Sequence, residues 1–248
     1  MSDFLNKLTS KQNVVGTFVK TPDPITMEVL SLSGLDYVIL DAEHAPFGRR
    51  ELDQCIMTCR LVGLPCIVRV PDSEPATILN AFDCGASGIQ LPHVKTAEQA
   101  ERIVKLSRYG ENGRGFAGST RQANYGTTPL SEHLQNNQDP LVIVQIEDPE
   151  GVDNAHDIAA VDGVSALFIG RVDLTVAYNE TNPDSEKVIN ACSAVCHAGR
   201  SVNKPVGIFL PTTENITMWQ ELGINMYAIA SEHAMIIKGF KAVVEDFH

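Results

Sequence analysis

The sequence has no long hydrophobic run. No uninterrupted apolar stretch approaches the roughly 18 residues that a membrane-spanning helix needs. The N-terminal residues, Met-Ser-Asp-Phe-Leu-Asn-Lys-Leu, are mostly polar and contain no apolar core of the kind found in a secretory signal peptide. We therefore expect no membrane partner and a cytoplasmic location.

Positive charge is also scarce. The chain has 19 lysine and arginine residues against 31 aspartate and glutamate residues, which gives a formal net charge of −12. Nucleic acids and anionic membranes bind clustered positive charge. The charge balance therefore argues against both as partners and is typical of a well-hydrated surface.

The six cysteines form no Cys-x-x-Cys motif; they stand at positions 55, 59, 66, 84, 192 and 196. Two pairs have i, i+4 spacing, Cys55 with Cys59 and Cys192 with Cys196. A structural zinc site usually has four converging nitrogen or sulfur ligands. We interpret these cysteines as reduced thiols of the core, as expected in the cytosol.

The chain does have a regular alternation of apolar runs and helical patterns. Eight runs rich in β-forming residues predict strands: Val14–Val19, Tyr37–Leu40, Cys66–Val70, Gly88–Pro92, Leu141–Ile146, Ala166–Ile169, Val206–Leu210 and Met226–Ala230. Between most of them lie segments with helical spacing: Glu51–Leu61, Pro75–Cys84, Ala97–Tyr109, Ser185–Val202 and Thr213–Leu222. Several helices are followed by a glycine, as expected of a left-handed residue that closes a helix: Gly34, Gly63, Gly85 and Gly223.

This alternation predicts an α/β fold with a parallel sheet. A chain of 248 residues has the usual size of an eight-stranded barrel. We therefore expect a (β/α)8 TIM barrel that forms a single domain over residues 1–248.

One irregular stretch interrupts the pattern, from Gly110 to Pro140. It is rich in glycine and also contains Pro129. A loop of this length in a compact domain is usually functional. We expect it either to cover a site or to reach a neighbouring subunit.

Ionisable side chains cluster where the predicted strands end. Tyr37–Leu40 is followed directly by Asp41, with Glu43 and His44 next. The third run places Arg69 among apolar neighbours, and a buried guanidinium needs a carboxylate or an anionic ligand. Because the carboxyl ends of barrel strands carry the catalytic residues of this fold, these side chains predict an active site there. For Arg69 the alternatives are a salt bridge that stabilises the barrel and the binding of an anion or enolate.

Two carboxylates follow neighbouring strands, Glu147 after the fifth run and Asp173 after the sixth. Adjacent strands lie about 4.8 Å apart, which suits two oxygen ligands of one divalent cation. With no cysteine nearby, Mg²⁺ or Mn²⁺ fits this pair better than structural zinc. Gly170 would either let a ligand approach backbone amides up to Asp173 or be needed only for a turn.

Four segments together resemble the HpcH/HpaI aldolase family. They are Asp41-Ala42-Glu43-His44-Ala45-Pro46, Arg69-Val70-Pro71, Gln145-Ile146-Glu147 and Phe168-Ile169-Gly170-Arg171-Val172-Asp173-Leu174. Further matches are Gly113-Arg114-Gly115 and Gly207-Ile208, and the resemblance runs from about Val14 to Glu232. Members of that family are class II, metal-dependent, pyruvate-forming aldolases on an (α/β)8 barrel. The resemblance implies the same fold and a carbon–carbon lyase activity.

The resemblance also implies roles around the metal. Glu147 and Asp173 would bind the divalent cation, which would be Mg²⁺ or Mn²⁺, or else Co²⁺ or Zn²⁺. The backbone of Gly170, Val172 and Asp173 would hold the pyruvate carboxylate. Gln145 would be a further substrate contact near the metal.

Three more roles concern charge and proton transfer. Arg69 would bind the substrate and stabilise the enolate oxygen. His44 would transfer protons through a metal-bound water, tuned by an acid. Asp41 is one candidate for that acid, and Asp83 is the other, since it matches an acid that such enzymes bring from an adjacent subunit.

The expected reaction is reversible retro-aldol cleavage of a 4-hydroxy-2-oxo acid into pyruvate and an aldehyde through a metal-bound enolate. No buried lysine stands at a strand end, so Schiff-base catalysis is the weaker mechanism. A second candidate is decarboxylation of oxaloacetate followed by transfer of the enolate to another acceptor. A third is a non-catalytic relative that binds a 2-oxo acid, and the intact set of acid, histidine and arginine residues argues against it.

Two departures from the family pattern concern the substrate. Arg171 and Val172 stand where the family usually has Pro-Ala, and Arg171 would add a charge beside the expected carboxylate site. Tyr109-Gly110-Glu111 replaces a frequent Tyr-Pro-Pro. These changes leave the metal ligands intact and bear on substrate identity. We expect the other histidines, among them His93 and His233, to lie outside the chemistry.

The last segment, Ala234–Phe247, has an apolar pattern too broad for one narrow stripe. The alternatives are a helix packed on its own barrel and a helix exchanged between subunits. The resemblance implies a homo-oligomer, commonly a hexamer built as a trimer of dimers.

Overall fold

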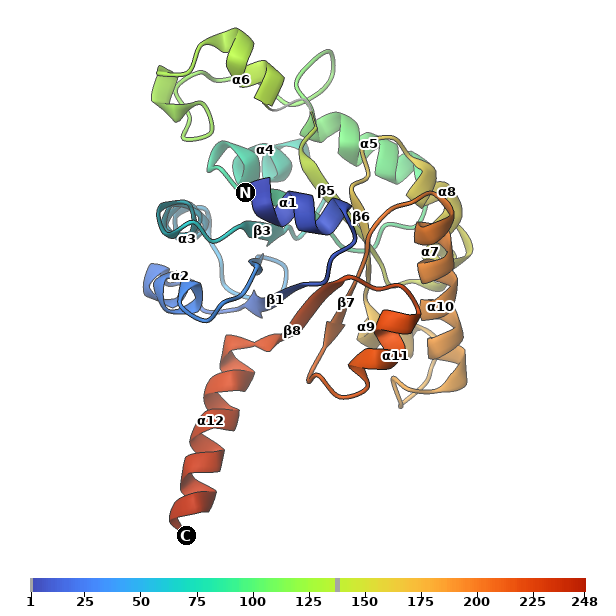
Figure 1. Ribbon diagram of the computed structural model, residues 1–248. Helices are drawn as coiled ribbons and strands as arrows, with labels where there is room; N and C mark the ends of the chain where they lie inside the picture. Colours follow the sequence, from blue (N-terminus) through green and yellow to red (C-terminus); the bar gives the residue numbers. More distant parts are fainter. Residues whose placement is uncertain (1, 137–138) are drawn as a thin grey trace.

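The eight strands close into a parallel barrel (Figure 1). The computed structural model describes residues 2–136 and 139–248. Each strand pairs with the next along the chain, and the last pairs with the first. The strands are β1 (Val14–Val19), β2 (Tyr37–Asp41), β3 (Cys66–Arg69), β4 (Gly88–Leu91), β5 (Leu141–Ile146), β6 (Ala166–Ile169), β7 (Val206–Leu210) and β8 (Met226–Ser231). The predicted (β/α)8 TIM barrel is confirmed, and no strand end differs from the predicted one by more than one residue.

Most of the helices surround the barrel, and the last one points away from it (Figure 1). They are α1 (Ser2–Thr9), α2 (Pro24–Ser31), α3 (Arg49–Val62), α4 (Pro75–Asp83), α5 (Ala97–Ser107), α6 (Leu130–Asn136), α7 (Pro149–Asp153), α8 (Ala155–Ala160), α9 (Arg171–Ala177), α10 (Glu186–Ser201), α11 (Ile216–Glu221) and α12 (Glu232–Phe247). The five predicted helical segments correspond to α3, α4, α5, α10 and α11. Gly63 closes α3 at φ 75°, and its amide donates to the carbonyl of Cys59. This is the left-handed residue that the sequence predicts there.

Alternate strand residues point into the barrel, where they form an apolar cluster. This inner cluster comprises Phe4, Leu8, Val14, Phe18, Tyr37, Ile39, Ile67, Leu141, Ile143, Ala166, Phe168, Met226 and Ala228. Phe4 and Leu8 come from α1, and the Phe4 ring lies 5.2 Å from that of Tyr37. Helix α1 therefore closes the amino end of the barrel and leaves the other end for the site.

The intervening residues point outward and pack under the helices. They form a second and larger buried cluster, which includes all six cysteines. Each cysteine is buried and none forms a disulfide. The interpretation of the cysteines as free thiols of the core is confirmed.

Polar side chains replace apolar ones at the last inward positions of several strands. Asp41 continues the inward series of Tyr37 and Ile39, and Arg69 continues that of Ile67. Asp41 lies directly opposite Arg69 in the β2–β3 register, and Arg69 lies opposite Gln90 in the β3–β4 register. Strand pairing therefore gathers these polar groups at the carboxyl end of the barrel.

The glycine-rich stretch from residue 110 to 140 is more ordered than the sequence predicts. It contains a short 3-10 turn at Asn124–Gly126 and helix α6; residues 137 and 138 lie outside the described residues. Because it connects α5 to β5, it lies at the amino ends of the strands, opposite the end from which α12 leaves (Figure 1). The expectation that this stretch covers a site is therefore wrong for the active site of the same barrel, which lies at the carboxyl ends of the strands. The alternative, a contact with a neighbouring subunit, stays a prediction.

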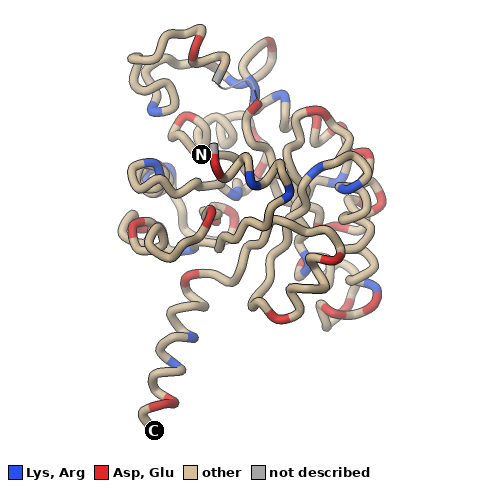
Figure 2. The backbone as a smooth tube through the Cα atoms, viewed as in Figure 1, with Lys and Arg blue, Asp and Glu red and all other residues tan. Residues whose placement is uncertain are grey.

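Helix α12 points away from the barrel instead of packing on it (Figure 1). Glu232 is its one buried residue, while Phe240 is 70% and Phe247 85% exposed. The alternative in which this helix covers its own barrel is therefore wrong. Figure 2 shows charged residues of both signs over the helices of the barrel and also along α12. Within the described ranges, no helix combines the length and the apolar character needed to cross a lipid bilayer.

Candidate active site

A cavity of about 300 Å³ opens at the carboxyl ends of the strands. Its lining comprises Phe18, Lys20, His44, Arg69, Gln145, Phe168, Gly170, Arg171, Val172, Asp173, Phe209 and Ser231. Six of the predicted site residues are among them: His44, Arg69, Gln145, Gly170, Val172 and Asp173. A second cavity, of about 370 Å³, lies at the opposite end beside Cys59 and Cys66 and contains none of the predicted site residues. The first cavity is therefore the candidate active site.

Asp41 lies beneath this cavity between two cations. Its side chain is fully buried. Arg69 donates to Oδ1 from Nε at 2.9 Å and from Nη2 at 2.8 Å, and Lys20 Nζ lies 2.9 Å from Oδ2. Burial raises the pKa of Asp41, but Arg69 and Lys20 outweigh it, so the pKa lies below its ordinary value. Asp41 is thus a permanent anion that orients its partners.

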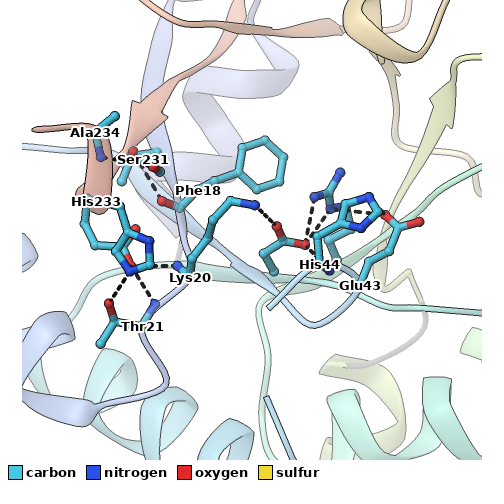
Figure 3. Close-up of polar contacts among 12 residues, drawn as sticks. Phe18, Lys20, Thr21, Glu43, His44, Ser231, His233 and Ala234 are labelled. Atoms are coloured by element: carbon cyan, nitrogen blue, oxygen red, sulfur yellow. Dashed lines mark hydrogen bonds and ion pairs between the residues drawn. The ribbon is translucent and has the colours of Figure 1, made fainter. Parts of the chain in front are cut away.

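His44 lies beside Glu43 at the rim of the cavity (Figure 3). Its side chain is 57% exposed. Its backbone amide donates to Asp41 Oδ1 at 3.2 Å. Its ring Nε2 lies 3.6 Å from Oε2 of Glu43, and that carboxylate also lies 3.4 Å from Arg69 Nε. Within this chain Asp41 therefore orients the loop of His44, while Glu43 is the acid that faces the imidazole ring.

Glu147 is buried at the end of β5 and held by hydrogen bonds to both oxygens. The backbone amide of His93 donates to Oε1 at 2.8 Å, and the side-chain amide of Gln145 donates to Oε2. The Gln145 carbonyl oxygen in turn accepts from Gln90 on β4. Burial raises the pKa of Glu147 to about 7, and the nearby negative charge of Asp173 acts in the same direction. The protein therefore holds a carboxyl group that resists ionisation unless a positive charge compensates it.

The pair Glu147 and Asp173 fits a divalent cation. Asp173 lies in the first turn of α9 at the cavity wall, close enough to Glu147 to influence its pKa. Among the described residues, no group of three or more His, Cys, Asp or Glu side chains lies close enough together to hold a metal ion. Two carboxylate oxygens suit an ion such as Mg²⁺ or Mn²⁺ that takes its other ligands from substrate and water.

Gly170 is required by the packing of Glu147. A Cβ atom at this position would come within 2.5 Å of Glu147 Cβ and still closer to its carboxylate. Its φ of −86° is open to other residues, so the alternative of a glycine needed only for a turn is wrong. The amide of Gly170 already donates to Ile146, while the amides of residues 171–173 precede the first helical hydrogen bond of α9, from Leu174 to Gly170. The amides open to a carboxylate are therefore those of Arg171, Val172 and Asp173.

The Arg171 guanidinium does not add charge to this site as its position suggests. Its side chain is 10% exposed and Nη1 lies 2.5 Å from Asp184. The guanidinium lies 5.4 Å from the ring centroid of Trp219 on α11. Arg171 therefore turns into the helical layer, where it anchors the start of α9.

Asp83 lies at the other end of the barrel. It is the last residue of α4, just before the start of β4, whereas His44 follows the end of β2. Burial raises the pKa of Asp83, against the opposing charge of Arg114. The chain alone therefore does not bring Asp83 to His44.

Lys20 and Gln90 belong to the site although the sequence does not single them out for it. Lys20 follows a strand, a place where a lysine is usually a surface cation. Its signal is the inward spacing from Val14 and Phe18. Gln90 is the one polar residue of β4 and is fully buried. Both keep the inward period of their strands, as do Asp41 and Arg69.

Comparisons with known proteins agree with this geometry. The sequence model of the HpcH/HpaI aldolase/citrate lyase family matches residues 14–238. The chain is 34% identical to a 5-keto-4-deoxy-D-glucarate aldolase of Salmonella arizonae over 97% of this chain and 94% of that relative. A family protein from Burkholderia cenocepacia J2315 superposes with a TM-score of 0.93 at 27% identity, over 100% of this chain and 99% of that one. Citrate synthase SbnG superposes with a TM-score of 0.87 at 28% identity, over 98% and 96%.

The relatives that are named for an aldolase activity support a carbon–carbon lyase activity for this chain. The sequence match begins with β1 and continues into α12, so it includes every strand that contributes to the cavity. The chain belongs to the HpcH/HpaI aldolase/citrate lyase family.

Proposed function

We propose that this chain is a class II, divalent-metal-dependent aldolase that cleaves a 4-hydroxy-2-oxo acid into pyruvate and an aldehyde. The observation that carries the proposal is that His44, Arg69 and Asp173 line one cavity, while Glu147 lies directly against Gly170 in the wall of the same cavity. A 2-oxo acid placed between them would meet groups for charge, orientation and proton transfer.

Glu147 and Asp173 would hold the cation, which as a Lewis acid would polarise the 2-oxo group of the substrate. The amides of residues 171–173 would receive the substrate carboxylate at the start of α9. Gly170 leaves the room in which Glu147 and the substrate lie side by side.

Arg69 would stabilise the negative charge that develops at the C2 oxygen. Its Nε and Nη2 are engaged by Asp41, while Nη1 has no hydrogen-bond or ion-pair partner among residues 2–136 and 139–248. A donor aimed at the developing charge is among the largest contributions to catalysis. The breaking C3–C4 bond would leave its electrons in the enolate, whose oxygen Nη1 would meet.

His44 would take the proton of the C4 hydroxyl as that carbon becomes the aldehyde carbonyl. Its exposed imidazole stands at the rim of the cavity, and Oε2 of Glu43 lies 3.6 Å from Nε2. Return of a proton to C3 of the enolate would give pyruvate and complete the reaction.

The substrate class follows from the relatives. The Salmonella arizonae relative is named for 5-keto-4-deoxy-D-glucarate, which, numbered from its other end, is itself a 4-hydroxy-2-oxo acid. We infer that this chain acts on an acid of the same class. Arg171 bears little on that choice, because its guanidinium lies against Trp219 and Asp184.

We further propose that the protein assembles with copies of itself through α12. Ile236, Phe240, Val244 and Phe247 recur at the spacing of one helix face, and each is more than half exposed. Uncovered apolar residues also lie beside β1, where Ile25 and Val29 on α2 are 64% and 62% exposed. A contact between copies would bury both faces, and a homo-oligomer such as a trimer of dimers would offer the route by which Asp83 reaches a neighbour's His44.

The assay that tests the proposed reaction is pyruvate release from racemic 4-hydroxy-2-oxoheptanedioate and from 5-keto-4-deoxy-D-glucarate. The purified protein is stripped with EDTA and then given Mg²⁺, Mn²⁺, Co²⁺ or Zn²⁺. We expect release to stop on stripping and to return with metal. Release that continues unchanged in EDTA would contradict the metal dependence, and binding of pyruvate without any turnover would favour a non-catalytic role.

A second candidate function uses the same site on a different substrate. Citrate synthase SbnG is named for a reaction that forms a carbon–carbon bond, and this similarity favours an enzyme that joins an enolate to an acceptor. We propose as the second candidate that the enolate comes from decarboxylation of oxaloacetate and is transferred to another acceptor. Incubation with oxaloacetate, with and without an acceptor 2-oxo acid, separates the two. Consumption of oxaloacetate together with failure to cleave any hydroxy-oxo acid would favour this second function.

A further inference from the structure

Lys20 is a charged residue of the cavity to which the proposed reaction gives no role. It follows the end of β1, its side chain is 34% exposed, and it contributes to the cavity wall. Nζ lies 2.9 Å from Oδ2 of Asp41 (Figure 3). Among the described residues this is its one ion pair.

The two oxygens of Asp41 have different partners. Oδ1 accepts from both Nε and Nη2 of Arg69, at 2.9 Å and 2.8 Å, while Oδ2 is occupied by Lys20. An isolated Arg–carboxylate pair favours a fork in which two guanidinium nitrogens meet two different oxygens. Here Lys20 occupies the second oxygen, so the guanidinium stays on the first.

The orientation of Arg69 that results matters for the substrate. The guanidinium carbon of Arg69 lies 4.6 Å from the ring centroid of Phe18, and Nη1 is left without a protein partner in the described chain. A rotation toward Oδ2 would move Nη1 relative to the cavity. Displacement of a catalytic group by about 1 Å costs rate rather than binding.

Lys20 is itself held from the root of α12. The amides of Lys20 and Thr21 donate to Oε1 of Glu232 at 2.7 Å and 2.5 Å. The Thr21 hydroxyl lies 2.9 Å from Nε2 of His233 (Figure 3). The position of Lys20 is therefore fixed at its backbone as well as at its ammonium group.

From these contacts we propose that Lys20 is a positioning residue, which occupies Oδ2 of Asp41 and so holds Arg69 with Nη1 directed to the substrate oxygen. The functional half of this inference rests on the proposed aldolase reaction. Its structural half, the dependence of the Arg69 orientation on Lys20, does not.

The first test is a crystal structure of the Lys20→Met variant. We expect the Arg69 guanidinium to rotate so that it contacts both oxygens of Asp41. Lys105→Met, on the exposed side of α5, is the matched control and should leave Arg69 in place. An unchanged Arg69 in Lys20→Met would overturn the inference, whatever reaction the protein catalyses.

The second test is a double-mutant cycle on pyruvate release with Lys20→Met, Asp41→Asn and the pair. We expect Lys20→Met to lower kcat by about tenfold or more with KM changed by less than about threefold. On the Asp41→Asn background it should have little further effect, because the carboxylate through which it acts is gone. Lys20→Arg, which keeps a cation, should restore part of kcat.

Two kinetic outcomes would overturn this account. Additive losses in the cycle would mean that Lys20 acts without Asp41. A raised KM confined to substrates with a second carboxylate, at unchanged kcat, would make Lys20 a substrate-binding residue instead. If the wild-type protein released no pyruvate from any substrate, the proposed function would fail, and the crystal structure of Lys20→Met would still decide the positioning role.

Discussion

At the scale of a single residue, protonation of Glu147 would compete with the proposed binding of a metal ion. Burial raises the pKa of its carboxyl from 4.5 to about 7, so the metal-free folded state binds this proton more tightly than the unfolded state does. The contribution of Glu147 to the free energy of unfolding is therefore fully present below about pH 4.5, and it is lost as the pH rises toward 7. A cation needs the ionised carboxylate and must displace the proton.

We expect metal affinity to rise with pH through the same window. With one proton competing at a pKa of about 7, Mn²⁺ should bind about tenfold more weakly near pH 6 than near pH 8. Isothermal titration calorimetry at the two pH values measures this ratio. Glu147→Gln is the control, and equal affinities for the wild type at both pH values would show that Glu147 is not a ligand.

Glu147 and His44 should fail in different ways when each is replaced. Glu147→Ala removes half of the proposed cation site, so we expect metal-dependent activity to fall by roughly a hundredfold or more. His44→Ala leaves Glu147 and Asp173 intact, and it should still bind metal and pyruvate while kcat falls by about 10²–10⁴. Binding measurements alongside kinetics separate the two. Wild-type activity in Glu147→Ala without added metal would contradict its assignment.

Many residues of the candidate site can be predicted one by one from the sequence. Those that cannot be predicted are missed for a physical reason. Arg69 and Gln145 stand out because each interrupts an apolar run, and an isolated polar residue in a buried strand needs a partner. Lys20 escapes because a lysine after a strand looks the same whether it faces water or an acid brought by the next strand. The contact with Asp41 exists because β1 and β2 are neighbours.

At the scale of the element, α9 shows how a departure from a family pattern is absorbed. Arg171 opens this helix and is tied to Asp184 before α10 and to Trp219 on α11. A charge predicted beside the substrate thus becomes a link between helices. The sequence correctly predicts that Arg171 lies next to the cavity. The direction of its long side chain depends on Asp184 and Trp219, which come close to it only in the folded protein.

Replacement of Arg171 should therefore affect stability more than substrate binding. Arg171→Met removes a partly buried ion pair and a ring contact, so we expect the free energy of unfolding to fall by about 1–3 kcal/mol. KM for the hydroxy-oxo acid should change by less than about threefold. Thermal unfolding and steady-state kinetics on the same preparation test both. An unchanged melting temperature with a tenfold higher KM would mean that the guanidinium meets the substrate.

Helices and strands are predicted well where the spacing of the apolar residues and the length of the segment indicate the same element. The eight strands follow from apolar runs between helical segments, and the structure moves their ends by one residue at most. The stretch from 110 to 140 is harder to predict, because its many glycines give no sign of α6 or of the ring contacts among Tyr109, Phe116 and His133. Nothing in a short local pattern tells which end of a barrel such a stretch covers.

At the scale of the whole molecule, α12 leaves a large apolar surface uncovered. Exposed apolar patches of this kind mark association surfaces. The same helix begins at Glu232, which fixes the backbone of Lys20 and Thr21. The proposed assembly through α12 would therefore involve the same helix that fixes the backbone of Lys20 in the active site.

Charge placed on the apolar face of α12 should break the assembly. We expect the double substitution Phe240→Asp and Val244→Asp to reduce the mass measured by light scattering after size-exclusion chromatography. Activity should fall as well if a neighbour supplies Asp83 to His44. Lys241→Asp, a charge change on the same helix, is the control. A wild-type protein that runs as a monomer would contradict the assembly proposal.

We propose that Glu147, Asp173 and Arg69 form a site that generates the enolate of pyruvate with a divalent cation. The most direct measurement follows the methyl protons of pyruvate by NMR in D₂O, with protein stripped of metal, with metal restored, and with Glu147→Gln. We expect these protons to exchange for deuterium only when metal is present, and we expect the exchange to be lost in Glu147→Gln. Exchange that persists without metal, or that survives Glu147→Gln at the wild-type rate, would contradict it.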